Sequence, residues 1–320
     1  MTGSREQPGA APKVSVIIPA YGMPHYLNQA IESVSRQTFT DYELLVVDDG
    51  SDDECVARYE LPKTARLIRH ESNRGAGAAR NTGIRAGKGD YVALLDHDDV
   101  WLPGKLEAQV AILEANPDAS LAYCRCILVD DELNPKSDTR WTEKSPSADP
   151  LRQFLDGCFI RSCSAVMVRR EAFHEVGMFD ESLTGTDDGD FYMRLALHHG
   201  FVYDPEPLAL YRMHAGQFTR SLAKIGRSRV RMFANVLPEI KRNRPDLVWP
   251  ARRRLSTCHL LCAHALLHYE RAPLAAAKTL LAGLVAWPAN ATIYGRLAWM
   301  PFAALRYVVK SSRDPRRTRP

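Results

Sequence analysis

The sequence predicts an α/β protein with a mainly parallel central sheet flanked by helices. Three observations predict this class. Short β-branched runs alternate with segments of helical periodicity through the first hundred residues, turn residues close the runs, and the strand–helix–strand order repeats. The chain has 320 residues, of which 45% are hydrophobic and 25% charged, so it can bury a sizeable core. This composition excludes wholesale disorder, a collagen-like repeat and a small disulfide scaffold.

Local patterns predict the first half of the sheet. Residues 14–19 form a β-branched run that ends at a proline, and residues 25–37 carry apolar side chains at the helical period. A second strand at 42–47 closes on Asp48-Asp-Gly-Ser51, a strong turn and helix-start signal. The same reasoning predicts a weaker strand at 65–69, a helix of small residues at 75–86 and a strand at 91–95.

The second half of the chain is less regular. Residues 117–150 are polar and rich in Asp and Pro, which predicts an excursion from the core. Two apolar helical stretches near the end, joined at Ala272-Pro273, predict a helical hairpin over 256–269 and 274–287. Between these regions the pattern predicts an apolar segment at 159–168, a helix at 171–179, a helix that starts at Asp187, and short strands at 201–203 and 208–212.

Carboxylates gather where the predicted strands end, at the edge where parallel sheets bind ligands. The strand ends carry Pro19-Ala20-Tyr21, Asp48-Asp49-Gly50-Ser51-Asp52 and Asp96-His97-Asp98-Asp99. Asp is common in turns and at helix N-caps, and Asp52 fits that structural interpretation equally well. Asp96, Asp98 and Asp99 repel one another, and a bound cation would hold such a cluster together. Hard oxygen ligands suit Mg²⁺ or Mn²⁺ rather than Zn²⁺.

Three further features have both a functional and a structural interpretation. Gly75-Ala-Gly77 begins a near match to a dinucleotide-binding fingerprint, but Arg80 stands at the last glycine and the preceding strand is weak. A dehydrogenase is therefore disfavoured, and Arg80 becomes a candidate neighbour of a phosphate. Asp187-Asp188 either stabilises a helix N-terminus or forms a second functional pair. His214 follows a strand directly, where it is either structural or a metal ligand.

Together these residues resemble glycosyltransferase family 2. The resemblance extends from about residue 14 to residue 214, and the family is inverting and has the GT-A fold. Two departures are Asp187, where the family usually has Glu, and Gly22, where Asn commonly follows the tyrosine. The motifs that carry the resemblance are Val14-Ser-Val-Ile-Ile-Pro-Ala-Tyr21, Asp48-Asp49-Gly50-Ser51, Asn81, Asp96-x-Asp98-Asp99 and Asp187-Asp188.

The resemblance implies a donor-binding site at the strand ends. Asp49 is expected to accept a hydrogen bond from N3 of a pyrimidine, and Asp96 is expected near the ribose. Ala20 and Tyr21 are expected to line the uracil or ribose pocket. The full expected donor-binding set is Pro19, Ala20, Tyr21, Asp49, Arg80, Asn81 and Asp96.

The resemblance also implies a divalent cofactor, Mg²⁺ or Mn²⁺, and a catalytic base. Asp98, Asp99 and His214 are the expected metal ligands. A divalent ion offsets the negative charge that develops on a departing nucleoside diphosphate. The acceptor hydroxyl is a poor nucleophile, so Asp188, with Asp187 beside it, is expected to take its proton.

The implied reaction moves a sugar from a UDP-hexose donor to a hydroxyl of a glycan or lipid-linked acceptor, in cell-surface polysaccharide or glycoconjugate synthesis. A non-catalytic nucleotide-sugar-binding or scaffold protein is the first alternative, but such a protein would be expected to lose Asp188 or the Asp96–Asp98 pair. The second alternative, a nucleotidyltransferase, would need a basic glycine-rich loop after the first strand, where Pro19-Ala-Tyr-Gly22 stands.

Three parts are predicted: small polar residues indicate a flexible leader at 1–13, the resemblance implies a catalytic domain at 14–223, and the charge pattern indicates a basic helical extension at 224–320. Residues 1–223 hold 23 Lys and Arg against 34 Asp and Glu, whereas residues 224–320 hold 19 against 4. A solvated basic surface and attachment to an anionic membrane surface explain the extension equally well. Nucleic acid is disfavoured, because the aromatic residues are not interleaved with the arginines.

The cysteine pattern favours a reducing compartment. The seven cysteines are odd in number and include no C-x-x-C pair, and no signal peptide precedes residue 14. The expected location is therefore cytoplasmic, with the extension able to attach the protein to the cytoplasmic face of the membrane.

Overall fold

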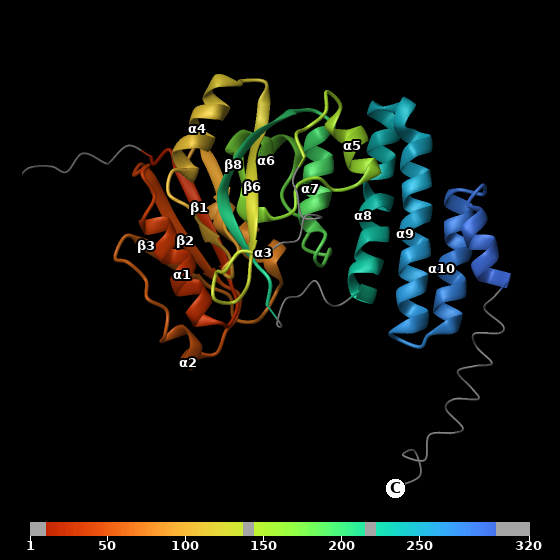
Figure 1. The fold of residues 1–320 in the computed structure, drawn as a ribbon, viewed down its shortest axis with the longest axis horizontal. Coiled ribbons are helices and arrows are strands. Elements are labelled where there is room, and N and C mark those ends of the chain that lie inside the picture. Colours follow the sequence, from red (N-terminus) through yellow and green to blue (C-terminus); the bar gives the residue numbers. More distant parts are fainter. Residues whose placement is uncertain (1–10, 137–143, 215–221, 299–320) are drawn as a thin grey trace, which may run out of the picture. The chain divides into compact units, whose positions relative to one another are not determined.

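The computed structural model describes residues 11–136, 144–214 and 222–298, and it divides them into two compact units (Figure 1). The first unit comprises residues 11–136, 144–182 and 187–214, and the second comprises 183–186 and 222–298. Most of the expected leader, and residues 299–320 of the expected extension, lie outside the described residues.

The first unit is built on one mixed sheet with the strand order β3-β2-β1-β4-β7-β6-β8-β5. The first four strands run parallel, β6 and β8 run parallel to each other, and β7 and β5 run antiparallel to their neighbours. The bounds are β1 (Val14–Ala20), β2 (Tyr42–Asp48), β3 (Ala65–Arg69), β4 (Tyr91–Leu94), β5 (Val100–Trp101), β6 (Ala119–Val129), β7 (Val166–Arg169) and β8 (Gly200–Arg212). The predicted fold class is confirmed.

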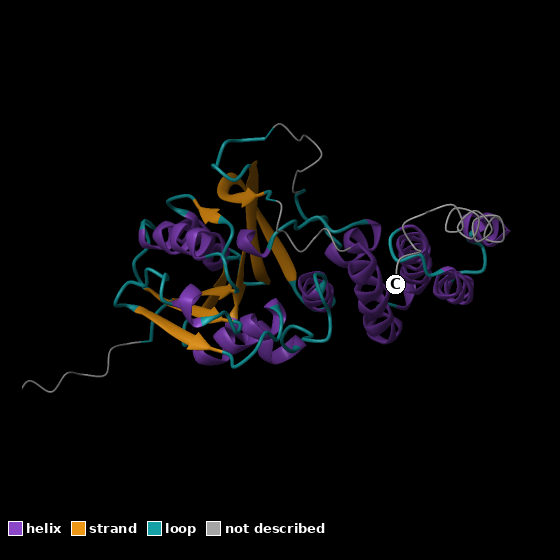
Figure 2. Ribbon diagram, turned by 90° about the horizontal axis from the view of Figure 1, so that it is seen from below, coloured by secondary structure: helices purple, strands orange, loops and turns teal. Residues whose placement is uncertain are grey.

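Helices lie on both sides of this sheet (Figure 2). They are α1 (Pro24–Ser35), α2 (Asp53–Val56), α3 (Ala76–Ala86), α4 (Lys105–Ala115), α5 (Pro150–Asp156), α6 (Arg170–Val176) and α7 (Asp187–Ala196), with a 3₁₀ turn η1 (Cys163–Ala165). Helix α1 shows the local cause: Pro24 suits a first helical turn, and Leu27, Ala30, Ile31 and Val34 bury one face. The first four predicted strands and the first two predicted helices agree with the structure to within two residues.

Two expectations for the second half of the chain were wrong. The region 117–150 contains β6, a long strand whose residues are mostly buried. Its apolar sequence was obscured by polar residues on both sides. The two short strands at 201–203 and 208–212 are the single strand β8. Pro205 and Pro207 interrupt the apolar pattern, and the shift of register from Cys124–Asp204 to Arg125–Pro207 accommodates them as a bulge.

The second unit contains helices α8 (Leu222–Asn243), α9 (Val248–His268) and α10 (Pro273–Ala286), with a 3₁₀ turn η3 (Pro245–Leu247). Residues 291–298 are also helical. Helix α9 lies between α8 and α10 (Figure 1). The predicted hairpin corresponds to α9 and α10, although α9 begins eight residues earlier than expected, and α8 was not predicted. No helix in the described part of the chain is both long and apolar enough to cross a bilayer.

Lys105 is a fully buried cation in the core of the first unit. Its ammonium donates to Gln109 Oε1 at 2.6 Å and lies 4.1 Å from the centre of the Trp101 ring. No carboxylate contacts it among the described residues. Burial therefore lowers the pKa of Lys105 from 10.5 to about 8.

We expect this buried ammonium to make stability depend on pH. Between pH 8 and 10.5 the unfolded chain holds the Lys105 proton more tightly than the folded chain, so the free energy of unfolding rises with pH. From pH 8 to pH 10 the gain is on the order of 2 kcal/mol. Urea unfolding of Lys105→Met should lack this gain, whereas the exposed Lys88→Met should retain it. An unchanged pH slope in Lys105→Met would contradict the prediction.

Candidate functional site

The site begins at the carboxyl end of β1. Pro19 and Ala20 are the last two residues of the strand and are buried, whereas Tyr21 is 53% exposed. Gly22 and Met23 then adopt positive φ angles of 64° and 49°, which turn the chain sharply into α1. The Gly22 N–H donates to Ser51 Oγ at 2.8 Å and ties this turn to the end of β2. The turn leaves an exposed aromatic ring beside the strand ends.

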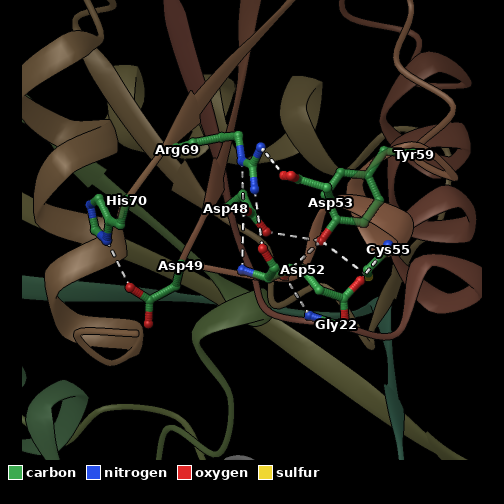
Figure 3. Close-up of polar contacts among 10 residues, drawn as sticks. Gly22, Asp48, Asp49, Asp52, Asp53, Cys55, Tyr59, Arg69 and His70 are labelled. Carbon is green, nitrogen blue, oxygen red and sulfur yellow. Dashed lines mark hydrogen bonds and ion pairs between the residues drawn. The ribbon is translucent and has the colours of Figure 1, made fainter. Parts of the chain in front are cut away.

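Asp48 and Asp49, at the end of β2, point in opposite directions (Figure 3). Asp48 is buried and accepts hydrogen bonds from the Tyr59 hydroxyl at 3.0 Å, the Ser51 N–H at 3.3 Å and Arg69 Nε at 3.3 Å. These contacts fix the turn after β2. Asp48 therefore has a structural role.

Asp49 lies among donors from the segment after β3. Its Oδ1 is 2.7 Å from His70 Nδ1 and accepts from the Arg74 N–H at 2.9 Å, and its Oδ2 accepts from the Gly75 N–H at 2.7 Å. The turn after β2 comes close to the backbone of Ser72, and this depends on Gly50, which has a φ of 81°. A Cβ at Gly50 would lie 2.5 Å from the Ser72 carbonyl carbon. This close approach is the physical reason for glycine in the Asp-Asp-Gly-Ser motif.

Arg80 joins the two groups of carboxylates. Its Nη2 donates to Asp96 Oδ1 at 2.6 Å, and its Nη1 donates to Asp187 Oδ2 at 2.7 Å. Arg80 is buried, and its guanidinium lies 5.7 Å from the centre of the Phe179 ring. The end of β4 and the start of α7, far apart in the sequence, are thereby held together by one cation.

Asn81, the next residue on α3, binds the segment before α7. Its Oδ1 accepts from the Phe179 N–H at 3.0 Å, and its Nδ2 donates to the Phe179 carbonyl at 2.9 Å. The same Nδ2 donates to Glu181 Oε1 at 3.0 Å, and Glu181 also pairs with Arg74. Its predicted contact with the donor stays a prediction, and these bonds give Asn81 a clear structural role.

Asp98 and His214 lie together although 116 residues separate them. Asp98 Oδ2 is 3.0 Å from His214 Nε2. Burial alone would raise the pKa of Asp98, but the hydrogen bond to His214 and the charges of His97 and His214 bring it below its ordinary value. The His214 ring lies 5.1 Å from that of Tyr26, centre to centre.

Arg212, which the sequence patterns did not single out, holds the Asp98 loop in place. It is fully buried at the end of β8, and its Nε donates to the Asp98 carbonyl at 2.8 Å. Its guanidinium lies 4.6 Å from the centre of the Tyr26 ring and also donates to the Asp131 carbonyl. Arg212, two residues before His214, thus holds the backbone of the Asp98 loop in place.

Asp99 points into the protein. Its Oδ1 accepts from the Arg212 N–H at 2.9 Å, and its Oδ2 accepts from the hydroxyls of Ser164 at 2.6 Å and Ser162 at 3.2 Å. Burial, followed by the charges of Asp98 and Asp96, raises the pKa of Asp99 well above its ordinary range. Its metal role stays a prediction, and its contacts place it beneath the Asp98 loop as a support.

Asp188 is the second residue of α7. Its Oδ1 accepts a hydrogen bond from the Gly189 N–H at 2.7 Å. Burial, followed by the charge of Asp187, raises the pKa of Asp188 to about 6. Burial also raises the pKa of Asp187, and Arg80 opposes that effect. A carboxylate with a pKa near 6 is a stronger base than an ordinary aspartate and is still ionised at neutral pH.

The side chains at the strand ends supply some, but not all, of the ligands that a divalent ion needs. No group of three or more His, Cys, Asp or Glu side chains in the described segments is arranged to hold a metal. Asp98 and His214 offer one carboxylate and one imidazole at the strand ends. Mg²⁺ sites that act on phosphates commonly use one or two carboxylates, with substrate oxygens and water completing the octahedron. A two-residue set therefore fits an ion that arrives with a diphosphate.

Comparison with known sequences identifies the family. A family model described as Glycosyl transferase family 2 matches residues 15–177, which is half of the chain. The chain belongs to glycosyl transferase family 2. It is therefore a glycosyltransferase, as the sequence motifs predicted. The matched residues belong to the first unit, which carries the site described above.

The family 2 match extends to named relatives. A glycosyltransferase of Rickettsia prowazekii (strain Madrid E) that is itself uncharacterised is 35% identical over 221 residues, covering 66% of this chain and 67% of the relative. A similar protein of Rickettsia felis is 32% identical, and there the match covers 36% of the relative. The UDP-Glc:alpha-D-GlcNAc-diphosphoundecaprenol beta-1,3-glucosyltransferase of Escherichia coli is 37% identical over 107 residues, covering 32% of this chain and 42% of that enzyme.

Solved structures of glycosyltransferases share the fold. TarS 1–349 of S. aureus in complex with UDP-GlcNAc superposes with a TM-score of 0.64 at 18% identity, covering 92% of this chain and 88% of TarS 1–349. A mannosyltransferase of Pyrobaculum calidifontis in complex with GDP-Man and Mn²⁺ gives a TM-score of 0.56 at 20% identity, covering 96% and 89%. The predicted GT-A fold is confirmed.

Proposed function

We propose that this family 2 enzyme transfers a hexose from a UDP-sugar to a hydroxyl of a glycan or lipid-linked acceptor, with inversion at the anomeric carbon. The named activity of the E. coli relative, which joins glucose from UDP-Glc to a diphosphoundecaprenol-linked sugar, supports this choice of donor and acceptor. The UDP-GlcNAc complex of TarS supports the choice of nucleotide. The proposed role is in cell-surface polysaccharide or glycoconjugate synthesis.

The donor is proposed to lie across the ends of β1, β2 and β4. Tyr21 offers an exposed ring for a base or ribose, and Asp49 offers carboxylate oxygens that His70 and two backbone N–H groups hold in place. Arg80 donates to Asp96, so the Asp96 carboxylate is held at the edge of the sheet where β1, β2 and β4 end. Pro19, Ala20, Arg80 and Asn81 complete the proposed donor site.

A divalent ion is proposed to bind with the donor. Asp98 and His214 would hold it, and Asp99 remains a proposed third ligand. When bound, Mg²⁺ or Mn²⁺ supplies Lewis-acid stabilisation of the charge that develops on the leaving diphosphate. Arg212 and Ser164 contribute by fixing the backbone that presents Asp98 and Asp96.

Asp188 is proposed as the catalytic base. An inverting displacement needs a carboxylate on the face of the sugar opposite the leaving group, where it accepts the proton of the attacking hydroxyl. Asp188 is raised in pKa yet ionised at neutral pH. Asp187 is proposed as the acceptor-side carboxylate of the pair, and Arg80 donates to it at 2.7 Å.

One observation carries this assignment: Arg80 bridges Asp96 and Asp187. Through this bridge one guanidinium links Asp96, at the proposed donor edge, to Asp187, the residue directly before the proposed base Asp188. Two separate carboxylate clusters without such a link would suit structural caps equally well. Linked by Arg80, one group of carboxylates can serve the donor and its metal ion while the other supplies the base, as sugar transfer requires.

The proposal is tested by donor turnover. Purified protein is incubated with UDP-glucose, UDP-GlcNAc, UDP-galactose or GDP-mannose and Mn²⁺, with and without a diphospholipid-linked sugar, and nucleotide release is measured. We expect UDP release from one UDP-hexose, accelerated by acceptor, and an inverted anomer in the product by NMR. Turnover of GDP-mannose alone, or a retained anomer, would refute the proposed donor or mechanism.

The raised pKa of Asp188 predicts the acid limb of the pH profile. The base must be deprotonated, so kcat/KM should fall about tenfold per pH unit below pH 6. Asp187→Asn removes the neighbouring negative charge, which lowers the pKa of Asp188 and should shift this limb to lower pH. Steady-state rates from pH 4.5 to 8 measure the shift. A limb that stays in place would show that another group titrates.

The organisation of the chain is also proposed. Residues 14–223 are proposed as the catalytic part, and residues 224–320 as a basic extension that attaches the enzyme to an anionic membrane surface. A lipid-linked acceptor lies at such a surface. The proposed location is therefore the cytoplasmic face of the membrane.

A further inference from the structure

Helix α10 has an exposed face that no part of the described chain covers. Ala276, Leu280 and Gly283 are the buried positions of this helix, whereas Leu274 is 80%, Leu281 55% and Val285 77% exposed. The exposed positions recur at the helical period on the side opposite the buried ones. We call them, together with the exposed lysine between them, the outer face: Leu274, Lys278, Leu281 and Val285.

The position of α10 within the second unit leaves this face open. Helix α9 and the helical residues 291–298 pack on the side of α10 that carries Ala276, Leu280 and Gly283, so the opposite side of α10 stays uncovered by the described residues. Helix α10 is apolar almost all round, because Lys278 is its single charged residue. A helix of this composition is normally covered on every side by protein or lipid.

Exposed apolar residues are concentrated in this unit. Eight of the eleven large hydrophobic residues that are exposed in the described chain belong to it. Single exposed apolar residues are ordinary, but the three on one side of α10 recur at the helical period and form one apolar stripe, which Leu261 on α9 is not part of. The eight residues are Leu222, Trp249, Leu261, Tyr269, Leu274, Leu281, Val285 and Tyr294.

The charge around the outer face is positive. The described part of the second unit holds thirteen Lys and Arg against three Asp and Glu. Two of the three acids are neutralised by arginines, since Glu270 pairs with Arg227 and Asp246 with Arg244, each at 2.8 Å. Cations also lie at the helix itself. Lys278 is on the outer face, Arg271 lies two residues before the helix, and Arg252 donates to the carbonyls of Val285 and Ala286 at its end.

A second copy of the chain does not suit this surface. A helix of 14 residues is about 21 Å long and about 10 Å wide, so it covers on the order of 200 Å². A stable protein interface buries about 800 Å² on each partner. Two copies would also bring two strongly basic surfaces together. An anionic bilayer, by contrast, accepts apolar side chains among its acyl chains and attracts the surrounding cations.

We propose that the outer face of α10 rests in the interface of an anionic phospholipid bilayer. Leu274, Leu281 and Val285 lie among the upper acyl chains, and Lys278 extends to the headgroup phosphates. This assignment deepens the proposed function by placing the enzyme where a lipid-linked acceptor is found. This inference rests on the proposed function, but vesicle binding is measured without turnover. Loss of membrane binding and loss of glycosyl transfer can therefore be told apart.

Flotation of the full-length protein with vesicles tests the proposal. Vesicles of equal parts phosphatidylglycerol and phosphatidylcholine are compared with pure phosphatidylcholine. The wild type should float with the anionic vesicles at low salt and remain behind with the neutral ones. Leu281→Glu/Val285→Glu should bind at least about tenfold more weakly. Leu261→Glu is the matched control, because Leu261 is a similarly exposed leucine on α9, and it should bind as the wild type does.

Two further measurements make the result decisive. Circular dichroism and thermal unfolding must show that the double variant is folded, and Lys278→Glu supplies a second variant that should weaken binding and its salt dependence. Equal binding of wild type and the double variant, or binding to neither vesicle, would refute the proposal. So would light scattering that shows a wild-type dimer and a monomeric double variant, since a second copy would then cover the face.

Discussion

The Asp188→Asn variant is expected to lose glycosyl transfer while it still binds the nucleotide sugar. Asparagine has the same shape as aspartate but cannot take the proton of the acceptor hydroxyl. General-base catalysis contributes about 10²- to 10⁴-fold, so kcat should fall by about that factor. The effect should fall on kcat rather than on donor affinity, because Asp188 lies on α7 and outside the proposed donor set. Acceptor turnover and calorimetry with UDP measure the two quantities.

Donor binding is the internal control for this variant. Calorimetry with UDP and Mn²⁺ should give the wild-type affinity for Asp188→Asn, and the acid limb of the wild-type pH profile should disappear from any residual activity. Full turnover by this variant would remove Asp188 as the base. Loss of UDP binding together with activity would instead point to a collapsed site.

The parallel half of the sheet could be predicted because its signals are local. β1, β2 and β4 are short buried runs, and each is closed within one or two residues by Pro or Asp. β6 and β8 could not be predicted in the same way. Their pairing involves a bulge around Pro205 and Glu206, and such a shift of register depends on the partner strand rather than on local composition.

The candidate site shows the same division. The pairing of Asp98 with His214 was expected because both residues follow strands and because the resemblance to family 2 implies that both are metal ligands. The structure brings them to 3.0 Å. His70, Arg212 and Glu181 were missed. Each of them acts through partners that come from another element, and nothing in their sequence neighbourhood marks them. Their signal is tertiary: a buried polar group needs a partner, and the partner is known only once the fold is known.

Arg80 illustrates how the fold changes the meaning of a residue. From sequence it was a candidate for phosphate binding, but both of its terminal nitrogens are bound to carboxylates. A buried guanidinium between Asp96 and Asp187 fixes two anionic side chains that would otherwise repel each other. Its proposed place in the donor site is therefore one of positioning.

Asp98→Ala is expected to abolish metal-dependent binding of the nucleotide. Asp98 and His214 are side chains that the fold brings together at the strand ends, and a metal ion held there would strengthen binding of a diphosphate by offsetting its charge. Loss of groups that merely support metal ligands costs about 10- to 100-fold in affinity, so loss of a ligand should weaken UDP binding with Mn²⁺ at least about 100-fold. Binding of UDP without metal should change little, because Tyr21 and Asp49 are unaffected.

Calorimetry with UDP, with and without Mn²⁺, separates these contributions for Asp98→Ala and for Asp98→Asn. Asparagine keeps an oxygen near His214 and removes the charge, so its affinity should fall between those of the wild type and the alanine variant. His214→Ala should weaken the metal-dependent part in the same way. Ser162→Ala, which removes a single hydroxyl from the buried Asp99, should leave the metal-dependent part nearly unchanged. Mn²⁺-dependent affinity that is unchanged in Asp98→Ala would exclude this aspartate from the metal site, whatever the other variants show.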